Sequence, residues 1–221
     1  MTSLFNQLKA SCESDWQAYT QHAFIEQLAL GTLPQACFKH YLLQDYIFLL
    51  HFARAFGLAV FKSNREEDIR FALSACEAIV NTELKLHISY CEEWGISQAD
   101  LADLPESTSN MAYTRYVLER GLAGDLLDLY VALAPCVIGY AKTAEWAQHL
   151  RKSNDGATDV YKSWIDMYIS DDYKGFAKAF EDRINTAGEG ISSGQREELA
   201  EVFSSATRLE VDFWQMGLDL S

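Results

Sequence analysis

Apolar residues recur at spacings of three and four along almost the whole chain, and this pattern constrains the fold more than any other feature of the sequence. A repeat near 3.6 residues places apolar side chains on one face of an α-helix. Only three of the 221 residues are proline, and the glycine-rich turn signals that separate strands are missing. We therefore predict an all-α fold, a helical bundle that forms a single domain over residues 1–221.

The pattern divides into eight predicted helices, with boundaries where the apolar spacing lapses. Pro34 suits the first turn of the second helix, because the N–H that proline lacks would have no partner there. Gly95 suits the C-cap of the third helix, and residues 152–156 read as a surface loop. The predicted helices span residues 3–30, 34–62, 66–94, 108–121, 124–150, 157–169, 172–188 and 193–218.

The charge and cysteine content exclude several classes of protein. The formal net charge is −14, and a chain this acidic repels nucleic acid and anionic lipid, so we expect neither as a partner. The N-terminal residues lack the apolar region of a secretory signal, and the most apolar stretch, 126–141, is too short to span a bilayer. The five cysteines form no CxxC pair, which indicates neither a disulfide framework nor a zinc site. We expect a soluble, cytoplasmic protein.

Two carboxylates lie where the helical period predicts apolar side chains. Asp45 falls in a stripe with Tyr41 and Phe48, and Glu210 falls in a stripe with Phe213. Burying a carboxylate is unfavourable unless it is paired, so the position of each of these carboxylates on an apolar face requires an explanation. A hydrogen bond to a tyrosine or to a neighbouring helix would serve packing alone. Two such carboxylates among aromatic side chains also suggest a polar pocket with aromatic walls.

Cys136 is the candidate nucleophile. It follows Pro135 on an apolar helix face and lies one turn before Tyr140, so the phenol can reach the neighbourhood of the thiol. Proline removes one backbone N–H, and we expect the helix to bend there and to open space for a ligand. A core cysteine in a bent helix is the structural alternative.

Glu83 and His87 lie one turn apart and could bind a metal. However, di-iron helical bundles use Glu-x-x-His twice, and the chain contains no Glu-x-x-His. We therefore predict no metal site, and we expect His87 to form a hydrogen bond between helices.

Five segments, taken in order, resemble the TenA family, also called thiaminase II. They are residues 41–49 (YLLQDYIFL), 110–114 (NMAYT), 133–136 (LAPC) with Tyr140, 161–168 (YKSWIDMY), and Glu210 with Phe213 and Trp214. The resemblance implies a haem-oxygenase-like fold that binds no haem and needs no metal or other cofactor. It also implies a homotetramer that hydrolyses 4-amino-2-methylpyrimidine compounds.

The resemblance assigns roles to individual positions. It implies that Asp45 and Glu210 hold the aminopyrimidine edge, that Cys136 is the nucleophile, and that Tyr113, Tyr140 and Tyr168 line and orient the pocket. Phe48 and Phe213 are placed to stack on the flat ring. Some family members have tyrosine at position 48, so a role that needs that hydroxyl is lost here. A subgroup has glutamate at the nucleophile position, and Cys136 places this chain in the cysteine-bearing class.

These residues suggest a reaction in thiamin salvage. Glu210 would protonate a ring nitrogen. The thiol of Cys136, activated in the network of Tyr140, would then add to the ring. Water would finally replace the leaving group, which is ammonia or thiazole. Three alternatives remain: an enzyme of the same fold that acts on another heterocycle, a non-catalytic protein that binds a thiamin precursor, and a di-iron or haem oxidase, which the missing Glu-x-x-His pairs disfavour.

Overall fold

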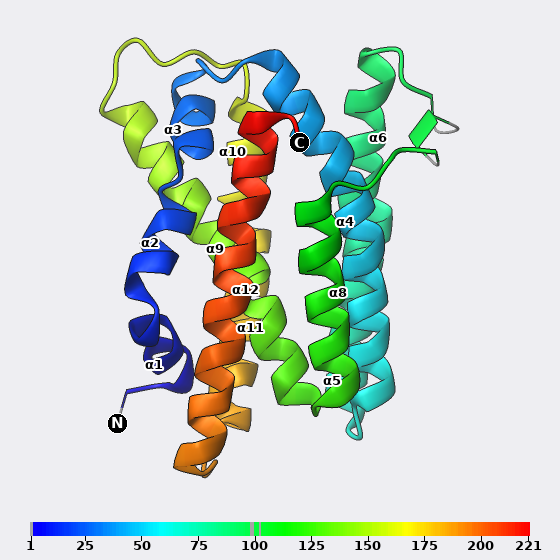
Figure 1. Ribbon diagram of the computed structural model, residues 1–221, viewed down its shortest axis with the longest axis vertical. Helices are drawn as coiled ribbons and strands as arrows, with labels where there is room; N and C mark the ends of the chain where they lie inside the picture. The colour runs from blue at the N-terminus through cyan, green and yellow to red at the C-terminus, as the bar shows by residue number, and fades with distance from the viewer. Residues whose placement is uncertain (1, 98–99, 102) are drawn as a thin grey trace.

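Figure 1 shows the computed structural model, which describes residues 2–97, 100, 101 and 103–221. The described residues form helices and no strands, which confirms the all-α prediction. The helices are α1 (Leu4–Ser11), α2 (Glu13–Thr20), α3 (Ala23–Leu30), α4 (Gln35–Lys62), α5 (Glu66–Ala78), the π-helix η1 (Ile79–Glu83), α6 (Leu84–Glu93), α8 (Thr108–Ala123), α9 (Leu126–Lys152), α10 (Lys162–Tyr168), α11 (Asp171–Ala187) and α12 (Ser193–Asp219).

Helix α9 runs through the middle of the bundle. Every residue from 129 to 141 is buried, and the helix packs against α2, α3, α4, α8, α10, α11 and α12. In Figure 1, α12 crosses in front of α9, α1 to α3 lie on one side, and α4 to α6 lie on the other. A helix that is apolar on all sides must be surrounded by protein or lipid, and here the surroundings are other helices.

The length of α9 corrects one expectation. The helix has 27 residues and is long and apolar enough to cross a membrane, whereas we expected its apolar stretch to be too short. However, 83% of its most apolar window is buried inside the protein. Its place in the core, rather than its length, accounts for its composition.

The prediction of one continuous helix over residues 3–30 is wrong, because the chain turns twice within this range. The backbone leaves helical geometry at Cys12, and His22 caps the third segment by accepting a hydrogen bond from the N–H of Phe24. The turns let three short helices follow the curved surface of the bundle, with α1 and α2 against α12 and α3 against α9. One straight helix could not bury apolar residues along all of these contacts.

The helix predicted over 66–94 is interrupted by η1. The N–H of Leu84 bonds to the carbonyl of Ile79, five residues back instead of four. Such a π-turn is often found at functional sites. After it, α6 continues to Glu93, and Gly95 adopts the left-handed conformation expected of a C-cap, with a φ of 72°.

The helix predicted over 157–169 begins only at Lys162. The preceding residues bond to distant parts of the chain: the N–H of Thr158 donates to Leu30, and the hydroxyl of Tyr161 donates to Leu33. These bonds hold residues 157–161 in an irregular connection. Local apolar spacing predicted a helix there, and tertiary contacts override it.

Helix α9 continues through Pro135, so the proline does not end it, and the bend that we expect there stays a prediction. The hydroxyl of Tyr19 donates to the carbonyl of Pro135 over 3.1 Å. Gly139 leaves room for this tyrosine, because a Cβ atom at position 139 would lie 2.2 Å from a ring carbon of Tyr19. The proline and the glycine together let α2 approach the central helix closely.

We predict that Gly139→Ala destabilises the protein by about 1–3 kcal/mol, because the added methyl group must displace Tyr19 in a filled core. Gly175→Ala in α11 is the matched control: its Cβ would meet no atom within 4 Å, and we expect a gain of about 0.5–1 kcal/mol. Denaturant unfolding of the three proteins measures both effects. Equal stability of Gly139→Ala and the wild type would contradict the packing argument.

Candidate active site

The structure brings the eight predicted site residues together at the centre of the bundle, and all of them are buried. They come from α4 (Asp45, Phe48), α8 (Tyr113), α9 (Cys136, Tyr140), α10 (Tyr168) and α12 (Glu210, Phe213). Because each helix contributes one apolar face to the core, polar residues in the middle of those faces must meet there.

Asp45 accepts two hydrogen bonds at the same oxygen. The hydroxyl of Tyr41 lies 3.3 Å from Asp45 Oδ2, and His87 Nε2 lies 2.6 Å from it. The indole N–H of Trp164 donates to the oxygen of Tyr41 over 3.1 Å, which directs the tyrosine hydrogen toward Asp45. The packing alternative is therefore present in the structure, because Asp45 does bond to a tyrosine and to a neighbouring helix.

The partners of His87 indicate its charge. Nδ1 lies 2.9 Å from the carbonyl oxygen of Glu83, which can only accept, so Nδ1 carries a hydrogen. Burial lowers the pKa of His87, but the hydrogen bond and the negative charge of Asp45 outweigh it, and the pKa is raised. His87 is thus the protonated partner of a buried ion pair. This contact is the interhelical hydrogen bond that we expected of His87.

Glu210 is a neutral acid at pH 7. Burial raises its pKa to about 8, with a further contribution from the charge of Asp45, while the hydrogen bond from Tyr113 opposes the shift. The Tyr113 hydroxyl donates to Glu210 Oε1 over 2.8 Å, which fixes one carboxyl oxygen. The other oxygen, Oε2, bonds to no described residue. Glu210 can therefore give a proton to a bound molecule.

Cys136 carries a thiol rather than a thiolate. Burial raises its pKa well above the usual value, and the charges of Glu210, Asp45 and Glu83 add to the shift. We expected the network of Tyr140 to activate the thiol. Within the described part of the chain, however, no hydrogen bond joins these two side chains. The side chain of Tyr140 instead lowers the pKa of Tyr41. A thiol must lose its proton before it can act as a nucleophile.

Aromatic rings form the walls around these groups. Phe48 lies with its ring centre 5.2 Å from that of Tyr113 and 5.5 Å from that of Phe213. The rings of Tyr140 and Tyr168 meet edge to face, with their centres 4.9 Å apart. Flat walls of this kind suit a flat heterocyclic ligand.

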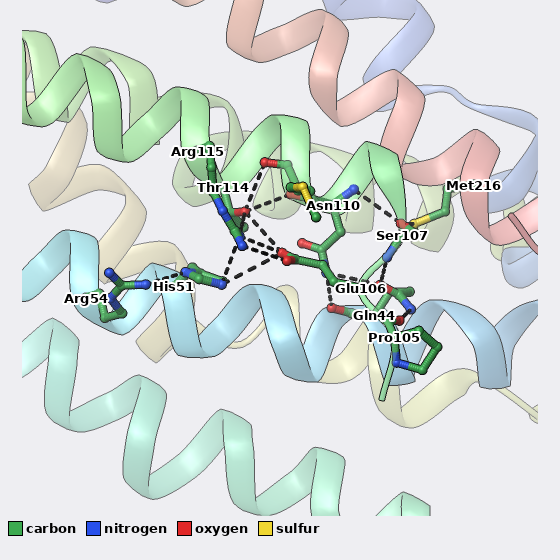
Figure 2. A network of polar contacts seen from close by, with 11 residues as sticks. Gln44, His51, Arg54, Pro105, Glu106, Ser107, Asn110, Thr114, Arg115 and Met216 are labelled. Atoms are coloured by element: carbon green, nitrogen blue, oxygen red, sulfur yellow. Dashed lines mark hydrogen bonds and ion pairs between the residues drawn. The ribbon is translucent and has the colours of Figure 1, made fainter. Parts of the chain in front are cut away.

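A polar network outside the walls fixes α4 against α8 (Figure 2). The side chain of Gln44 donates to the carbonyl of Pro105 and accepts from the N–H of Ser107, each over 2.9 Å. Asn110, which is fully buried, donates to the carbonyl of Gln44 over 2.8 Å. Because Asp45 is the next residue, this network holds its backbone in register with α8.

Figure 2 also shows an ion pair at the outer end of the same network. Arg115 binds both carboxylate oxygens of Glu106 over 2.7 Å, and His51 accepts from Arg115 over 3.0 Å. Half-exposed pairs contribute little stability, so the buried amides of Gln44 and Asn110 carry the positioning.

Several residues near the site carry chemistry that we did not assign from the sequence. Tyr41 and Trp164 orient Asp45, and Tyr173 donates to the carbonyl of Val137, next to the thiol, over 3.2 Å. Aromatics at helical spacing usually form core, so the sequence holds no signal that separates these from their neighbours. Among the described residues, no group of three or more His, Cys, Asp and Glu side chains is arranged to hold a metal ion.

Comparison with known proteins places these features in one family. The model of the TENA/THI-4/PQQC family matches residues 9–220. An uncharacterized protein of Haemophilus influenzae is 41% identical over 99% of this chain and 100% of its own length. The aminopyrimidine aminohydrolase of Halalkalibacterium halodurans is 32% identical over 91% of this chain and 89% of its own.

Solved structures agree on the fold. A Silicibacter protein described as a TenA family transcription regulator superposes with a TM-score of 0.91 and 45% identity, over 97% of this chain and 96% of its own. A Shewanella denitrificans domain with a heme oxygenase-like fold superposes with a TM-score of 0.73 at 11% identity, over 98% and 92%. The second match confirms the haem-oxygenase-like fold.

The raised pKa of Glu210 makes stability depend on pH. The folded state keeps the proton up to about pH 8, whereas an unfolded glutamate loses it near pH 4.5, so this contribution is complete at low pH and is lost as the pH rises through 8. We predict that Glu210→Gln reduces the decline in unfolding free energy between pH 5 and pH 8, by at most about 1.4 kcal/mol per pH unit. Denaturant titrations across that range, with exposed Glu77→Gln as the control, measure the slope. Parallel slopes for wild type and Glu210→Gln would show that Glu210 is ionised in the fold.

Proposed function

The chain belongs to the TENA/THI-4/PQQC family, and from this premise we propose that it is a hydrolase of 4-amino-2-methylpyrimidine compounds that acts in thiamin salvage. Its substrates would be 5-aminomethyl-pyrimidine, converted to hydroxymethylpyrimidine and ammonia, and thiamin, converted to hydroxymethylpyrimidine and a thiazole. The aminopyrimidine aminohydrolase of H. halodurans supports this assignment, because it matches along nearly the whole chain. Breakdown products of thiamin are the favoured physiological substrates.

One observation carries the proposal: Asp45, Glu210 and Cys136 are all buried, and both carboxyl groups lie close enough to the thiol to raise its pKa. Asp45 is paired with His87 over 2.6 Å, Glu210 is a neutral acid, and Cys136 is a neutral thiol whose pKa both carboxyl groups raise. A site that only packed the core would have no use for three such groups, because each is costly to bury. Together they form an acceptor, a proton donor and a nucleophile.

The aminopyrimidine would bind to the carboxyl oxygens of Asp45 and Glu210 that form no hydrogen bond with the described residues. Asp45 Oδ1 accepts no hydrogen bond from the described residues, and it is the natural acceptor for the exocyclic amino group. Glu210 Oε2 has the same freedom and would donate to a ring nitrogen. Phe48 and Phe213 would stack on the ring faces. Rings held between fixed walls lose orientational freedom before the reaction begins.

The reaction begins with two proton transfers. Glu210 gives its proton to the ring nitrogen as the thiol of Cys136 gives up its own, and Glu210, now anionic, is the acceptor for the thiol proton. Sulfur then adds to the ring carbon beside the carbon that bears the substituent. Because Glu210 is the nearby charge with the largest effect on Cys136, it suits both transfers.

The rest of the reaction replaces the substituent. Electrons of the dearomatised ring expel the substituent together with the pair of the C–N bond, which leaves an exocyclic methylene group. Water adds to that carbon, the C–S bond breaks, and the ring becomes aromatic again as the thiol regains a proton. The overall change is hydrolysis of one C–N bond.

The remaining features of the proposal concern the whole molecule. The protein assembles as a homotetramer, and Phe61 of α4 and Leu122 of α8, which are largely exposed, would be covered by another copy. It works in the cytoplasm, where a reducing environment keeps its five free cysteines as thiols. Light scattering of the purified protein measures the assembly directly.

Replacing the nucleophile tests the function. We predict that Cys136→Ser lowers turnover of 5-aminomethyl-pyrimidine by at least about a thousandfold, because a serine hydroxyl is a far weaker nucleophile at pH 7. Binding of hydroxymethylpyrimidine, which depends on Asp45, Glu210 and the rings, should change less than about threefold. Product formation by chromatography and binding by calorimetry are the measurements.

The control is Cys76→Ser on α5, whose thiol donates to the carbonyl of Ala53, as a serine can. It should turn over like the wild type. Near-normal activity of Cys136→Ser would exclude the covalent step. A wild-type protein that binds aminopyrimidines without turnover would instead be a sequestering protein, and one that leaves them unbound would act on another heterocycle.

A further inference from the structure

A hollow of about 460 Å³ lies between α4, α5, η1, α9, α10 and α11. Its walls include Val137, the neighbour of Cys136, and Glu83, whose carbonyl holds His87. Glu83 links the hollow to the site, because its charge helps to raise the pKa of Cys136, and the charge of Asp45 helps to raise the pKa of Glu83. A substituent on a pyrimidine ring held by Asp45 and Glu210 needs space of this kind.

Four aromatic rings and two carboxylates give the hollow its chemical character. The rings belong to Phe52, Phe56, Tyr173 and Phe176, and the carboxylates to Glu83 and Asp172. Its lining in the structure includes no lysine, arginine or histidine. Ring faces and carboxylates both attract organic cations, and nothing in this lining opposes them.

Glu83 is the carboxylate that lies nearest to the reacting groups. Its side-chain oxygens accept no hydrogen bond or ion pair from any residue that the structure describes, although the side chain is largely buried. Burial, together with the charge of Asp45, raises its pKa to about 7, while His87 acts against the shift. A partly buried carboxylate without a partner is unfavourable in the empty protein and is stabilised when a cation binds.

We infer that this hollow is a subsite for a positively charged leaving group, an ammonium or an N-alkylated azolium, and that Glu83 is its counter-ion. The inference rests on the proposed function and specifies further that the leaving group of the substrate is positively charged. Glu83 is thereby a specificity-determining residue, whereas its spacing from His87 in the sequence indicated only a possible metal ligand.

The charge of the leaving group changes in the reaction, and this predicts where Glu83 acts. When the C–N bond breaks, its electron pair goes to the positive nitrogen, so an ammonium departs as ammonia and an azolium departs as a neutral azole. The attraction to Glu83 is thus strongest before the bond breaks and is lost in the product. The C–N bond is still intact while sulfur adds to the ring, so when that step limits the rate the attraction is equal in the bound substrate and in the transition state, and it lowers KM without changing kcat.

The kinetic test compares charged and neutral leaving groups. We predict that Glu83→Gln raises KM for 5-aminomethyl-pyrimidine and for thiamin about tenfold, with kcat changed less than threefold. The N-formyl derivative of 5-aminomethyl-pyrimidine has an uncharged amide as its leaving group, and its KM should stay the same. Glu77→Gln on α5 removes one exposed charge that does not line the hollow and should leave every constant unchanged. Equal losses for charged and neutral substrates would overturn the inference.

A binding test keeps the inference separate from the proposed reaction. Choline and its uncharged carbon analogue, 3,3-dimethylbutan-1-ol, have the same shape, and calorimetry measures the affinity of each for the intact protein. We expect choline to bind the wild type at least tenfold more tightly than it binds Glu83→Gln, and the alcohol to bind both equally. This result without any turnover would support the cation subsite and contradict the proposed hydrolase. Choline binding that is absent, or unaffected by Glu83→Gln, would overturn the subsite even if the enzyme is active.

Discussion

The burial of α9 on every side is the constraint on which the rest of the structure depends. Seven other helices surround it, so any polar group that it carries, or that faces its middle, is removed from water. The same burial that packs the core therefore sets the proton states of the site: it raises the pKa of the Cys136 thiol and of the Glu210 carboxyl. Stability and chemistry have a single physical origin here.

The charges inside the bundle nearly cancel. The carboxylate of Asp45 is matched by the imidazolium of His87 at 2.6 Å, while Glu210 and Cys136 are uncharged at neutral pH. A low-dielectric interior tolerates one tight ion pair far better than separate charges. Glu83 is the exception, since its carboxyl group faces the hollow without a partner among the described residues, and the proposed cationic ligand would complete the balance.

The sequence predicted more of the site than of the connections that shape it. Asp45 and Glu210 could be found because a carboxylate within an apolar stripe is visible without a structure, and the resemblance to TenA added the tyrosines. The breaks at Cys12 and in η1 could not be predicted from the sequence, because contacts with α12 and α4, rather than the local apolar spacing, determine where they fall. The role proposed for Glu83 was also hidden, because a hollow formed by several helices leaves no pattern in any one of them.

The π-turn of η1 has a consequence for how this site can change in evolution. A helix advances by ~100° per residue, so the extra residue in that turn sets the direction in which everything after it points. Losing one residue from Ile79–Glu83 would restore an ordinary helix and swing His87 by about a quarter of a turn away from α4. Few substitutions could reorient a side chain so far without disturbing the core. Relatives that gain or lose this single residue would therefore be expected to differ in the side chain that contacts the carboxyl group at the position of Asp45.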